Sequence, residues 1–481
     1  MNTMTRVIAG SLVLAISLGC FKAFDAPECS SISDCPPGYT VCEDGYCFKK
    51  SVSGCEGAAP VPGDSCCPPT EGDRGRDTDC LVTDLDLGPV GAPSQPEDRY
   101  VVKALSAPAI LDDGSAIVSA VVEDGTGASV IMAFKTDSTL RQVVARARVG
   151  EGRVAMPVVV GGDFSVYVAY GQGVARLSVA ALEMEDDLHF GAVVGGVVAV
   201  AGDNPTVVFL TDSGMVEFYV EKKRTRIETK SSPENGAGEA FAPVLSASGR
   251  RAYWVFKSGQ VLAVRTMDNP VGPSASGCAD GDLVMSDVPR CSGDAPSGPA
   301  VEWGGVVYVP LVSGKVVALV EKESSRLTRK WILDLGGPIA GRLLVDTLGR
   351  VVAVLQDGRV WVVKDLEEVG SLVERGSFGE AMAQTPGVLG AAERVVAVSA
   401  GGRRILSLLR KEGATDGDFV QGLRFDVPVA PATALAMGDG VIVFGNAAGR
   451  LMAWTFPDRL PGSGFPKDGG DWFNRGGGLL P

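Results

Sequence analysis

The sequence predicts an all-β fold made of many short antiparallel strands, and three observations support this prediction. Glycine is abundant, with 63 among 481 residues, and it recurs between short runs of β-branched and aromatic residues. Several runs, such as residues 193–201 and 306–309, are apolar on consecutive positions, which is typical of strands covered on both faces. A helical interpretation fails because glycine and valine both disfavour helices.

A hairpin with glycine as its seventh residue occurs seven times. In each copy a strand, a tight turn and a second strand follow one another, as in residues 308–320 (YVPLVSGKVVALV). Glycine at this place supplies the positive φ that a tight turn requires. The turn glycines are Gly173, Gly214, Gly259, Gly314, Gly358, Gly402 and Gly449. Successive glycines lie 41 to 47 residues apart, except that 55 residues separate Gly259 from Gly314.

Further strands flank each hairpin. An apolar strand that in most copies opens with a small residue and proline precedes it, as at Gly337-Pro338, and a less apolar strand follows it, as at residues 328–335. Four strands in about 46 residues correspond to one blade of a β-propeller. With an eighth, looser copy at residues 117–135, we predict an eight-bladed propeller over residues 99–460. Seven blades are the alternative, and residues 461–481 form a C-terminal tail.

The last blade lacks an obvious fourth strand after Trp454. Residues 99–105 (RYVVKAL) precede the first Ala-Pro pair in the same way that residues 329–335 (RKWILDL) precede Gly337-Pro338. We therefore expect residues 99–105 to supply the outer strand of the last blade. Such closure removes an exposed sheet edge and joins the two ends of the ring.

The N-terminal segment has the form of a secretory signal. Residues 7–18 are apolar or small, and twelve residues span roughly 18 Å, well short of the ~30 Å hydrocarbon layer. Ser17-Leu18-Gly19-Cys20 resembles the lipobox of bacterial lipoproteins, with Ser17 and Leu18 in swapped order. The resemblance implies a signal peptide at residues 1–19, palmitate or another acyl chain on Cys20, and a tether at residues 20–28. The alternative is a plain secreted protein in which Cys20 joins a disulfide.

The cysteine count agrees with a lipid anchor. The chain has 11 cysteines, and setting Cys20 aside leaves ten in two even groups. Eight of them fall within residues 29–80, a segment too short to fold on a hydrophobic core alone, and we predict a disulfide-rich module there. These are Cys29, Cys35, Cys42, Cys47, Cys55, Cys66, Cys67 and Cys80, and their pairing is left open. Cys278 and Cys291 lie in the one long interval between turn glycines, and we expect them to form a bridge.

Several other readings of these segments are weaker. The adjacent Cys66 and Cys67 could form a redox-active disulfide, but neighbours in such modules usually bond to separate partners. The module has no CxxC pair and no histidine, so we expect no metal there. Residues 81–98 are rich in proline, glycine and aspartate without apolar periodicity, and they are predicted to be a linker.

Charge and histidine content restrict the function. With 44 basic and 58 acidic residues the formal net charge is −14, which disfavours nucleic-acid binding. His189 is the sole histidine, which removes most acid–base and zinc chemistry. The acidic residues 183–189 (EMEDDLH) could bind calcium, but a solvated outer strand is the better interpretation. We expect no metal, no cofactor and no catalytic residue.

The hairpins resemble the PQQ-like repeats of bacterial β-propellers. The closest match is Tyr308-Val309 with residues 313–319 (SGKVVAL), and the tryptophan that ends a repeat in this family survives at Trp331. Quinoprotein dehydrogenases of this family hold PQQ and calcium, but no acid–amide cluster maps onto their calcium ligands. The other branch contains non-catalytic lipoproteins that scaffold outer-membrane assembly. The tail segment 465–473 is similar to a segment found at the ends of PQQ-repeat proteins.

This resemblance implies a protein-binding lipoprotein rather than an enzyme. Because Phe21 is not the aspartate linked to inner-membrane retention, the expected location is the outer membrane, facing the periplasm or the cell surface. We expect a monomer, anchored through its lipid, that binds another envelope protein through segments 150–153, 232–239 and 376–384. The alternative is a funnel that binds a carbohydrate or cell-wall fragment, or keeps a residual quinoprotein-type site.

Overall fold

The computed structural model separates the chain into two units, Met1–Ala58 and Ala59–Pro481. It describes residues 41–43, 46–48, 81–88, 100–111, 113–161, 165–189, 191–200, 206–212, 215–220, 223–228, 240–246, 248–266, 275–279, 283–284, 290–291, 293–322, 326–346, 348–366, 369–384, 387–389, 394–410, 419–427, 429–438 and 441–455. The described residues form strands and no helix. Among them there is accordingly no helix long and apolar enough to cross a membrane.

The first unit contributes one described hairpin. Strand β1 (Val41–Glu43) pairs antiparallel with β2 (Tyr46–Phe48), and Cys42 lies opposite Cys47. The remaining cysteines of the predicted module, Cys20, the tail at 461–481 and the predicted contact segment 232–239 lie outside the described residues.

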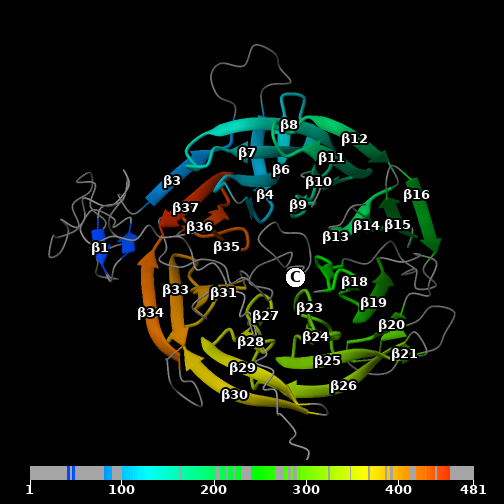
Figure 1. Ribbon diagram of the computed structural model, residues 1–481, viewed down its shortest axis with the longest axis vertical. Coiled ribbons are helices and arrows are strands. Elements are labelled where there is room, and N and C mark those ends of the chain that lie inside the picture. Colours follow the sequence, from blue (N-terminus) through cyan, green and yellow to red (C-terminus); the bar gives the residue numbers. More distant parts are fainter. Residues whose placement is uncertain are drawn as a thin grey trace, which may run out of the picture. The chain divides into compact units, whose positions relative to one another are not determined.

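The second unit is an eight-bladed β-propeller, as the sequence predicts (Figure 1). Within a blade we call the strands a to d from the centre of the ring outward. Blades 1 to 4 contain β4 (Tyr100–Leu105), β5 (Ala109–Ile110), β6 (Ala116–Asp124), β7 (Ser129–Thr136) and β8 (Val143–Glu151); β9 (Val159–Val160), β10 (Ser165–Tyr170), β11 (Gly173–Ser178) and β12 (Met184–His189); β13 (Val193–Val200), β14 (Thr206–Thr211), β15 (Met215–Val220) and β16 (Lys223–Glu228); β17 (Val244–Leu245), β18 (Arg251–Val255), β19 (Gln260–Arg265) and β20 (Ala275–Cys278).

The remaining blades follow the same order around the ring. Blades 5 to 8 contain β23 (Val301–Trp303), β24 (Val306–Pro310), β25 (Lys315–Lys322) and β26 (Arg326–Asp334); β27 (Leu344–Val345), β28 (Val351–Val354), β29 (Arg359–Leu366) and β30 (Val369–Ser377); β31 (Val388–Leu389), β32 (Val395–Val398), β33 (Arg404–Arg410) and β34 (Phe419–Asp426); β35 (Ala436–Gly438), β36 (Val441–Gly445), β37 (Arg450–Thr455) and β3 (Leu81–Asp86). The turns a–b and c–d lie on one face of the ring, which we call the a–b face, and the b–c turns lie on the other, the b–c face.

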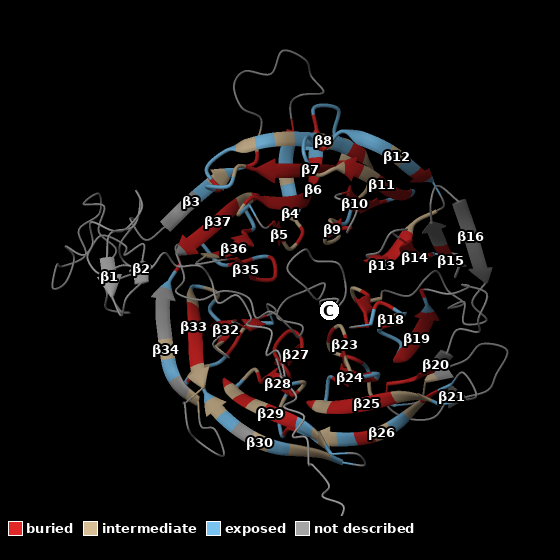
Figure 2. Ribbon diagram, viewed as in Figure 1, coloured by how far each residue is buried: buried red, intermediate tan, exposed pale blue. Residues whose placement is uncertain are grey.

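Burial decreases from the inner strands to the outer ones (Figure 2). Every residue of β10 is buried, whereas only two of the nine residues of β26 are buried. The core clusters join neighbouring blades, as where Ile117 and Ala133 of blade 1 pack with Val166 and Val168 of blade 2. Strands with apolar residues on consecutive positions are therefore covered on both faces by adjacent blades.

The turn glycines differ in what they contribute. Five of them have positive φ, namely Gly259, Gly314, Gly358, Gly402 and Gly449. Gly173 does not, so the predicted conformation is wrong there: it is the first residue of β11, pairs with Tyr170, and lies so near the Leu188 carbonyl that a Cβ would collide with it. Gly173 is required for this close approach and not for a turn. Gly214 lies outside the described residues.

The ring closes with a different strand from the one predicted. Strand β3 pairs with β37, so that Leu81 lies opposite Trp454 and Asp86 opposite Arg450. The predicted linker at residues 81–98 therefore begins with the outer strand of blade 8. The predicted closing strand, residues 99–105, instead contributes β4 to blade 1, where it pairs with residues 120–124 of β6.

The long hairpin of blade 1 explains this exchange. Strands β6 and β7 have nine and eight residues, and β5 covers only the first two positions of β6. Strand β4 covers the remaining edge of β6, which would otherwise expose unpaired backbone groups. Strand β3 carries aspartates on a solvated edge, which gave it the composition of a linker.

An insertion separates blades 4 and 5. Strands β21 (Leu283–Val284) and β22 (Arg290–Cys291) form a short hairpin within it, and Cys278 and Cys291 form a disulfide with a Cα–Cα distance of 5.5 Å. Ser276 of β20 makes a parallel pair with Arg326 of β26, which joins the outer strands of the two blades.

Candidate functional site

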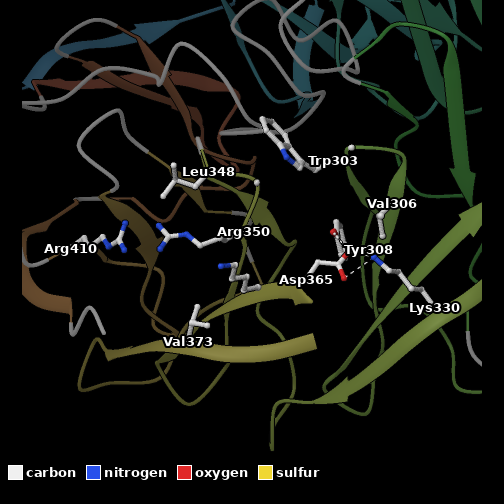
Figure 3. Close-up of a pocket in the computed structure, with 12 residues that line it drawn as sticks. Trp303, Val306, Tyr308, Lys330, Leu348, Arg350, Asp365, Val373 and Arg410 are labelled. Atoms are coloured by element: carbon white, nitrogen blue, oxygen red, sulfur yellow. Dashed lines mark hydrogen bonds and ion pairs between the residues drawn. The ribbon is translucent and has the colours of Figure 1, made fainter. Parts of the chain in front are cut away.

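A cavity of about 670 Å³ opens between blades 5, 6 and 7 (Figure 3). We call it the basic cleft, and it is lined by Trp303, Gly304, Val306, Tyr308, Lys330, Leu348, Gly349, Arg350, Lys364, Asp365, Val373 and Arg410. Four lining residues are basic and one is acidic. Two of the basic side chains are ion-paired, Lys330 with Asp365 and Arg350 with Asp346.

Two turns on the a–b face form one wall of the cleft. Trp303 pairs with Val306 across the turn at Gly304 and Gly305, both with positive φ. The Trp303 indole lies against Gly349 in the a–b turn of blade 6, where a Cβ would collide with it. Glycine at position 349 thus lets the tryptophan of one blade lie directly on the backbone of the next.

Two β-bulges aim further side chains into the cleft. The pairing of β25 with β26 skips Lys330, and the pairing of β29 with β30 skips Val373. A bulge turns the extra residue out of the regular alternation of the strand. For this reason Lys330 and its neighbour Trp331 both reach the same carboxylate, that of Asp365.

Asp365 ties blade 6 to blade 5. Its oxygens accept hydrogen bonds from Lys330 Nζ (2.8 and 3.0 Å), Trp331 Nε1 (2.8 Å) and the Tyr308 hydroxyl (3.1 Å). Trp331 is 5 % exposed and packs on Gly370 of blade 6, where a Cβ would crowd it. Burial raises the pKa of Tyr308, and the charge of Asp365 raises it further, so the hydroxyl stays a donor.

The turn between β27 and β28 holds the first of two arginines. Asp346 accepts hydrogen bonds from the amides of Leu348 (2.9 Å) and Arg350 (2.8 Å) and from Arg350 Nε (2.5 Å). Burial raises the pKa of Asp346, and the bonds from Arg350 oppose that shift. Arg350 and Arg410, which ends β33 in blade 7, point their guanidinium groups toward one another (Figure 3).

Exposed aliphatic side chains are concentrated in blade 6, and one of them, Leu348, lines the cleft. Eleven large apolar residues are exposed among the described residues, and four of them lie in this blade. They are Leu348 (66 % exposed), Leu366 (43 %), Val369 (56 %) and Leu372 (38 %). The basic cleft therefore combines basic side chains, an aromatic wall and exposed aliphatic surface.

Two predicted contact segments lie on the other face. Segments 150–153 and 376–384 continue from the outer strands β8 and β30 on the b–c face. The second borders a hollow of about 610 Å³, the outer hollow, which is lined by Arg359, Trp361, Arg375, Gly376, Ser377 and Phe419. The structure thus places the predicted segments and the basic cleft on opposite faces of the ring.

The sole histidine belongs to a cluster on the outer strand β12. The Tyr170 hydroxyl donates to Asp187 (2.5 Å) and lies 3.0 Å from His189 Nδ1, and His189 Nε2 lies 2.7 Å from Asp187. Burial raises the pKa of Tyr170, and the bond to Asp187 adds to this. Among the described residues no three His, Cys, Asp or Glu side chains are placed to hold a metal ion.

Comparison with known proteins shows that the chain shares its fold with solved structures but does not assign it to a family. No family model matches the sequence, and no curated protein does. Among solved structures, the C-terminal WD40 domain of Sif2 is similar with a TM-score of 0.53 and 8% identity, covering 78% of this chain and 98% of that one. Because its identity is so low, this likeness shows a shared propeller fold alone.

Two further structures are similar at lower scores. The designed protein Ika8 has a TM-score of 0.49 with 15% identity, covering 77% of this chain and 100% of that one. BamB from Moraxella catarrhalis has a TM-score of 0.43 with 14% identity, covering 74% of this chain and 98% of that one.

Proposed function

We propose that this protein is a lipoprotein of the outer membrane whose propeller is a non-catalytic scaffold that binds another envelope protein at the basic cleft. The observation that carries the proposal is the group of exposed aliphatic residues in blade 6, one of which, Leu348, lines the cleft. Exposed apolar side chains that gather at one place on a folded domain mark interaction sites. Four of the eleven exposed large apolar side chains among the described residues belong to this one blade.

The residue types of the cleft also support protein binding. Tryptophan, tyrosine and arginine carry most of the binding energy in protein interfaces, and the cleft contains Trp303 and two arginines. The Trp303 indole lies against the backbone of Gly349, which fixes the ring in the wall of the cleft. The blades hold all these groups on strands and short turns, which limits the ordering that binding must impose.

The polar groups of the cleft support binding more than chemistry. The Asp365 carboxylate is engaged by three donors, and Tyr308 keeps its proton because its pKa is raised. Asp346 is likewise held by Arg350. A general base or nucleophile needs a group that is poised to exchange a proton, and these groups are fixed in structural pairs.

Membrane anchoring rests on the sequence. Cys20 follows a short apolar segment, and the cysteine-rich region ends at Cys80, next to the first residue of the closing strand β3. Palmitate labelling of the wild type and of Cys20→Ser tests this part. Label on the wild type alone supports the anchor, and equal labelling of both contradicts it.

Affinity purification from detergent-solubilised membranes tests the scaffold. A stoichiometric protein partner that is retained by the wild type and lost from Trp303→Ala supports binding at the basic cleft. Arg375→Ala in the outer hollow is the matched control and should retain the partner. A preparation without any stoichiometric partner would contradict the scaffold.

A second candidate function is binding of a carbohydrate or cell-wall fragment. The outer hollow favours it, because Trp361 and Phe419 lie there beside Arg359 and Arg375, and aromatic faces with polar neighbours suit sugar rings. A melting temperature that rises with cell-wall glycans in the wild type, and does not rise in Phe419→Ala, would support this candidate.

A further inference from the structure

We infer that the outer hollow is a second binding site, for a cell-wall glycan in which alternate sugars carry a free carboxylate. The inference rests on the second candidate function and names the chemical class of its saccharide, and it does not depend on a protein partner at the basic cleft. The volume of the hollow, about 610 Å³, falls within the range of about 300–1,000 Å³ that is usual for ligand pockets.

Two neighbouring outer strands meet at the hollow. Strand β30 of blade 6 and β34 of blade 7 lie next to one another at the outside of the ring (Figure 1). Phe419, the first residue of β34, lies against Gly376 of β30, where a Cβ would collide with it. Glycine at position 376 therefore lets the phenylalanine of one blade lie directly on the backbone of the next, and both residues line the hollow.

Four further lining residues belong to one hairpin of blade 6. In the pairing of β29 with β30, Trp361 lies opposite Arg375. Arg359 and Ser377 form the equivalent pair two positions away along the same strands. Directly opposite residues, and residues two apart in a strand, share one face of a sheet. The indole, two guanidinium groups and a hydroxyl are thus grouped on one face.

Only one of the two arginines carries an unpaired charge. Arg359 donates from Nε and Nη2 to Asp357 (2.7 Å), and its Nη2 also donates to the Gly336 carbonyl (2.8 Å). Arg375 is exposed and forms no hydrogen bond or ion pair with the part of the chain that the structure describes. The hollow therefore offers one free guanidinium, which suits one carboxylate bound through paired hydrogen bonds.

The aromatic residues supply flat apolar surface. Trp361 and Phe419 are both half-buried, and Trp361 Nε1 is itself buried, so the accessible atoms of the indole are carbons. Such ring carbons pack against the C–H face of a sugar ring as they do against other apolar groups. None of the exposed large apolar side chains among the described residues lines this hollow, so it offers little surface to the aliphatic side chains of a peptide.

The hydroxyl groups of a saccharide also find partners here. Strand β30 ends its four-stranded sheet, so one edge of its backbone is unpaired, and residues 375–377 of this strand line the hollow. An edge strand presents N–H and C=O groups along its free side. Ser377 Oγ accepts a hydrogen bond from the Gly379 amide (3.1 Å), which leaves its O–H to donate. These groups match the hydroxyl and acetamido groups of neutral sugars.

The charges determine how densely the acid groups of the ligand are spaced. One free guanidinium pairs with one carboxylate, and a chain with a net charge of −14 repels a ligand that is charged on every sugar. A glycan in which neutral sugars alternate with sugars bearing a lactyl carboxylate has the lower charge density that this hollow requires. Cell-wall glycan from which the peptides have been removed has this structure.

Isothermal titration calorimetry of the full mature protein in detergent tests this inference with four tetrasaccharides. The first alternates N-acetylglucosamine with peptide-free N-acetylmuramic acid, and the others are tetramers of N-acetylglucosamine, galacturonic acid and glucosamine. We expect the alternating tetramer to bind at least about fivefold more tightly than the neutral N-acetylglucosamine tetramer, and the cationic glucosamine tetramer not to bind. Raised salt should remove the difference between the first two, because it screens exposed charges.

Arg375→Gln supplies the decisive comparison. It should lower the affinity for the alternating tetramer by about fivefold, to that of the neutral tetramer, whereas Arg375→Lys keeps the charge and should retain part of the preference. Arg265→Gln makes the same change at an exposed arginine in β19 of blade 4 and should leave all affinities unchanged. Phe419→Ala should weaken binding of every tetramer, and melting temperatures show that each variant is folded.

Four results would overturn the inference. These are equal binding of the alternating and neutral tetramers, an Arg375→Gln protein that keeps the preference, tighter binding of the galacturonic acid tetramer, and binding of a glutamate–serine peptide in place of the saccharides. If the alternating and neutral tetramers bind equally, the second candidate function stands and this inference fails. If no tetrasaccharide binds, both fail, and the scaffold proposal is still tested separately by retention of a partner at the basic cleft.

Discussion

Strand β3 closes the ring, and truncation of the residue that follows it tests this directly. Leu87 is fully buried and packs with Tyr100, Ile110 and Leu451, between blades 8 and 1. Its carbonyl also accepts a hydrogen bond from the Tyr100 hydroxyl (3.0 Å). Replacing a buried leucine by alanine removes apolar contacts and leaves a cavity, which costs about 2–5 kcal/mol. We therefore expect Leu87→Ala to lower the free energy of unfolding by that amount.

Urea unfolding followed by tryptophan fluorescence measures this effect. Val101→Ala is the matched control, because Val101 lies on the neighbouring strand β4 and is 60 % exposed, so its loss should change stability by no more than about 0.5 kcal/mol. A Leu87→Ala protein as stable as Val101→Ala would refute the reasoning, since residues 81–87 would then lie outside the cooperative ring.

Three further predictions concern other parts of the propeller. Asp365→Ala should lower the free energy of unfolding by about 1.5–3 kcal/mol, the range for a hydrogen bond to a charged group, and Asp365→Asn should lose less; equal losses in urea unfolding would contradict this. The pKa of Asp124 is lowered from 3.8 to about 2, chiefly by hydrogen bonds from Thr126, so its contribution to stability is present above pH 4 and is lost as the pH falls to 2. Melting temperatures of the wild type and Asp124→Asn should therefore converge between pH 4 and pH 2, and a constant difference would argue against this assignment. Reduction of the Cys278–Cys291 disulfide should lower stability by about 2–4 kcal/mol, an effect that a Cys278→Ala, Cys291→Ala variant should reproduce without reductant.

The repeating part of the fold was predictable because its signal is local. A tight turn between two buried strands requires glycine at a fixed place, and the strands are apolar on every residue because blades cover both faces. Five turn glycines have the expected positive φ. The prediction of a positive φ is wrong at Gly173 because the turn before it is shorter, so that glycine 173 already pairs with Tyr170 as part of the second strand.

The outer strands were harder to predict because one face of each meets water. Strand β3 has the sequence LVTDLD, in which Asp84 and Asp86 form ion pairs with Arg450 across the closing edge. Two acids in six residues look like a linker until the partner strand is known. That residues 100–105 join blade 1 and do not close the ring depends on the length of the β6–β7 hairpin and not on composition.

The basic cleft could not be predicted as a unit. Its lining residues run from position 303 to position 410, and only the ring brings its four basic residues together. Tyr308 and Trp331 stand out in the sequence as repeat residues, and both donate hydrogen bonds to Asp365. The β-bulges that aim Lys330 and Val373 inward leave no mark in the sequence, because a bulge depends on pairing register.

Site-specific photo-crosslinking in cells tests the central claim, that the a–b face of blades 5 to 7 binds a partner protein. A photoreactive residue at Leu348 lies in the basic cleft, and the same residue at Val312, which is 55 % exposed in a b–c turn, is the control on the other face. We predict one discrete protein adduct from position 348 and none from position 312. An adduct from position 312 with none from position 348 would contradict the account.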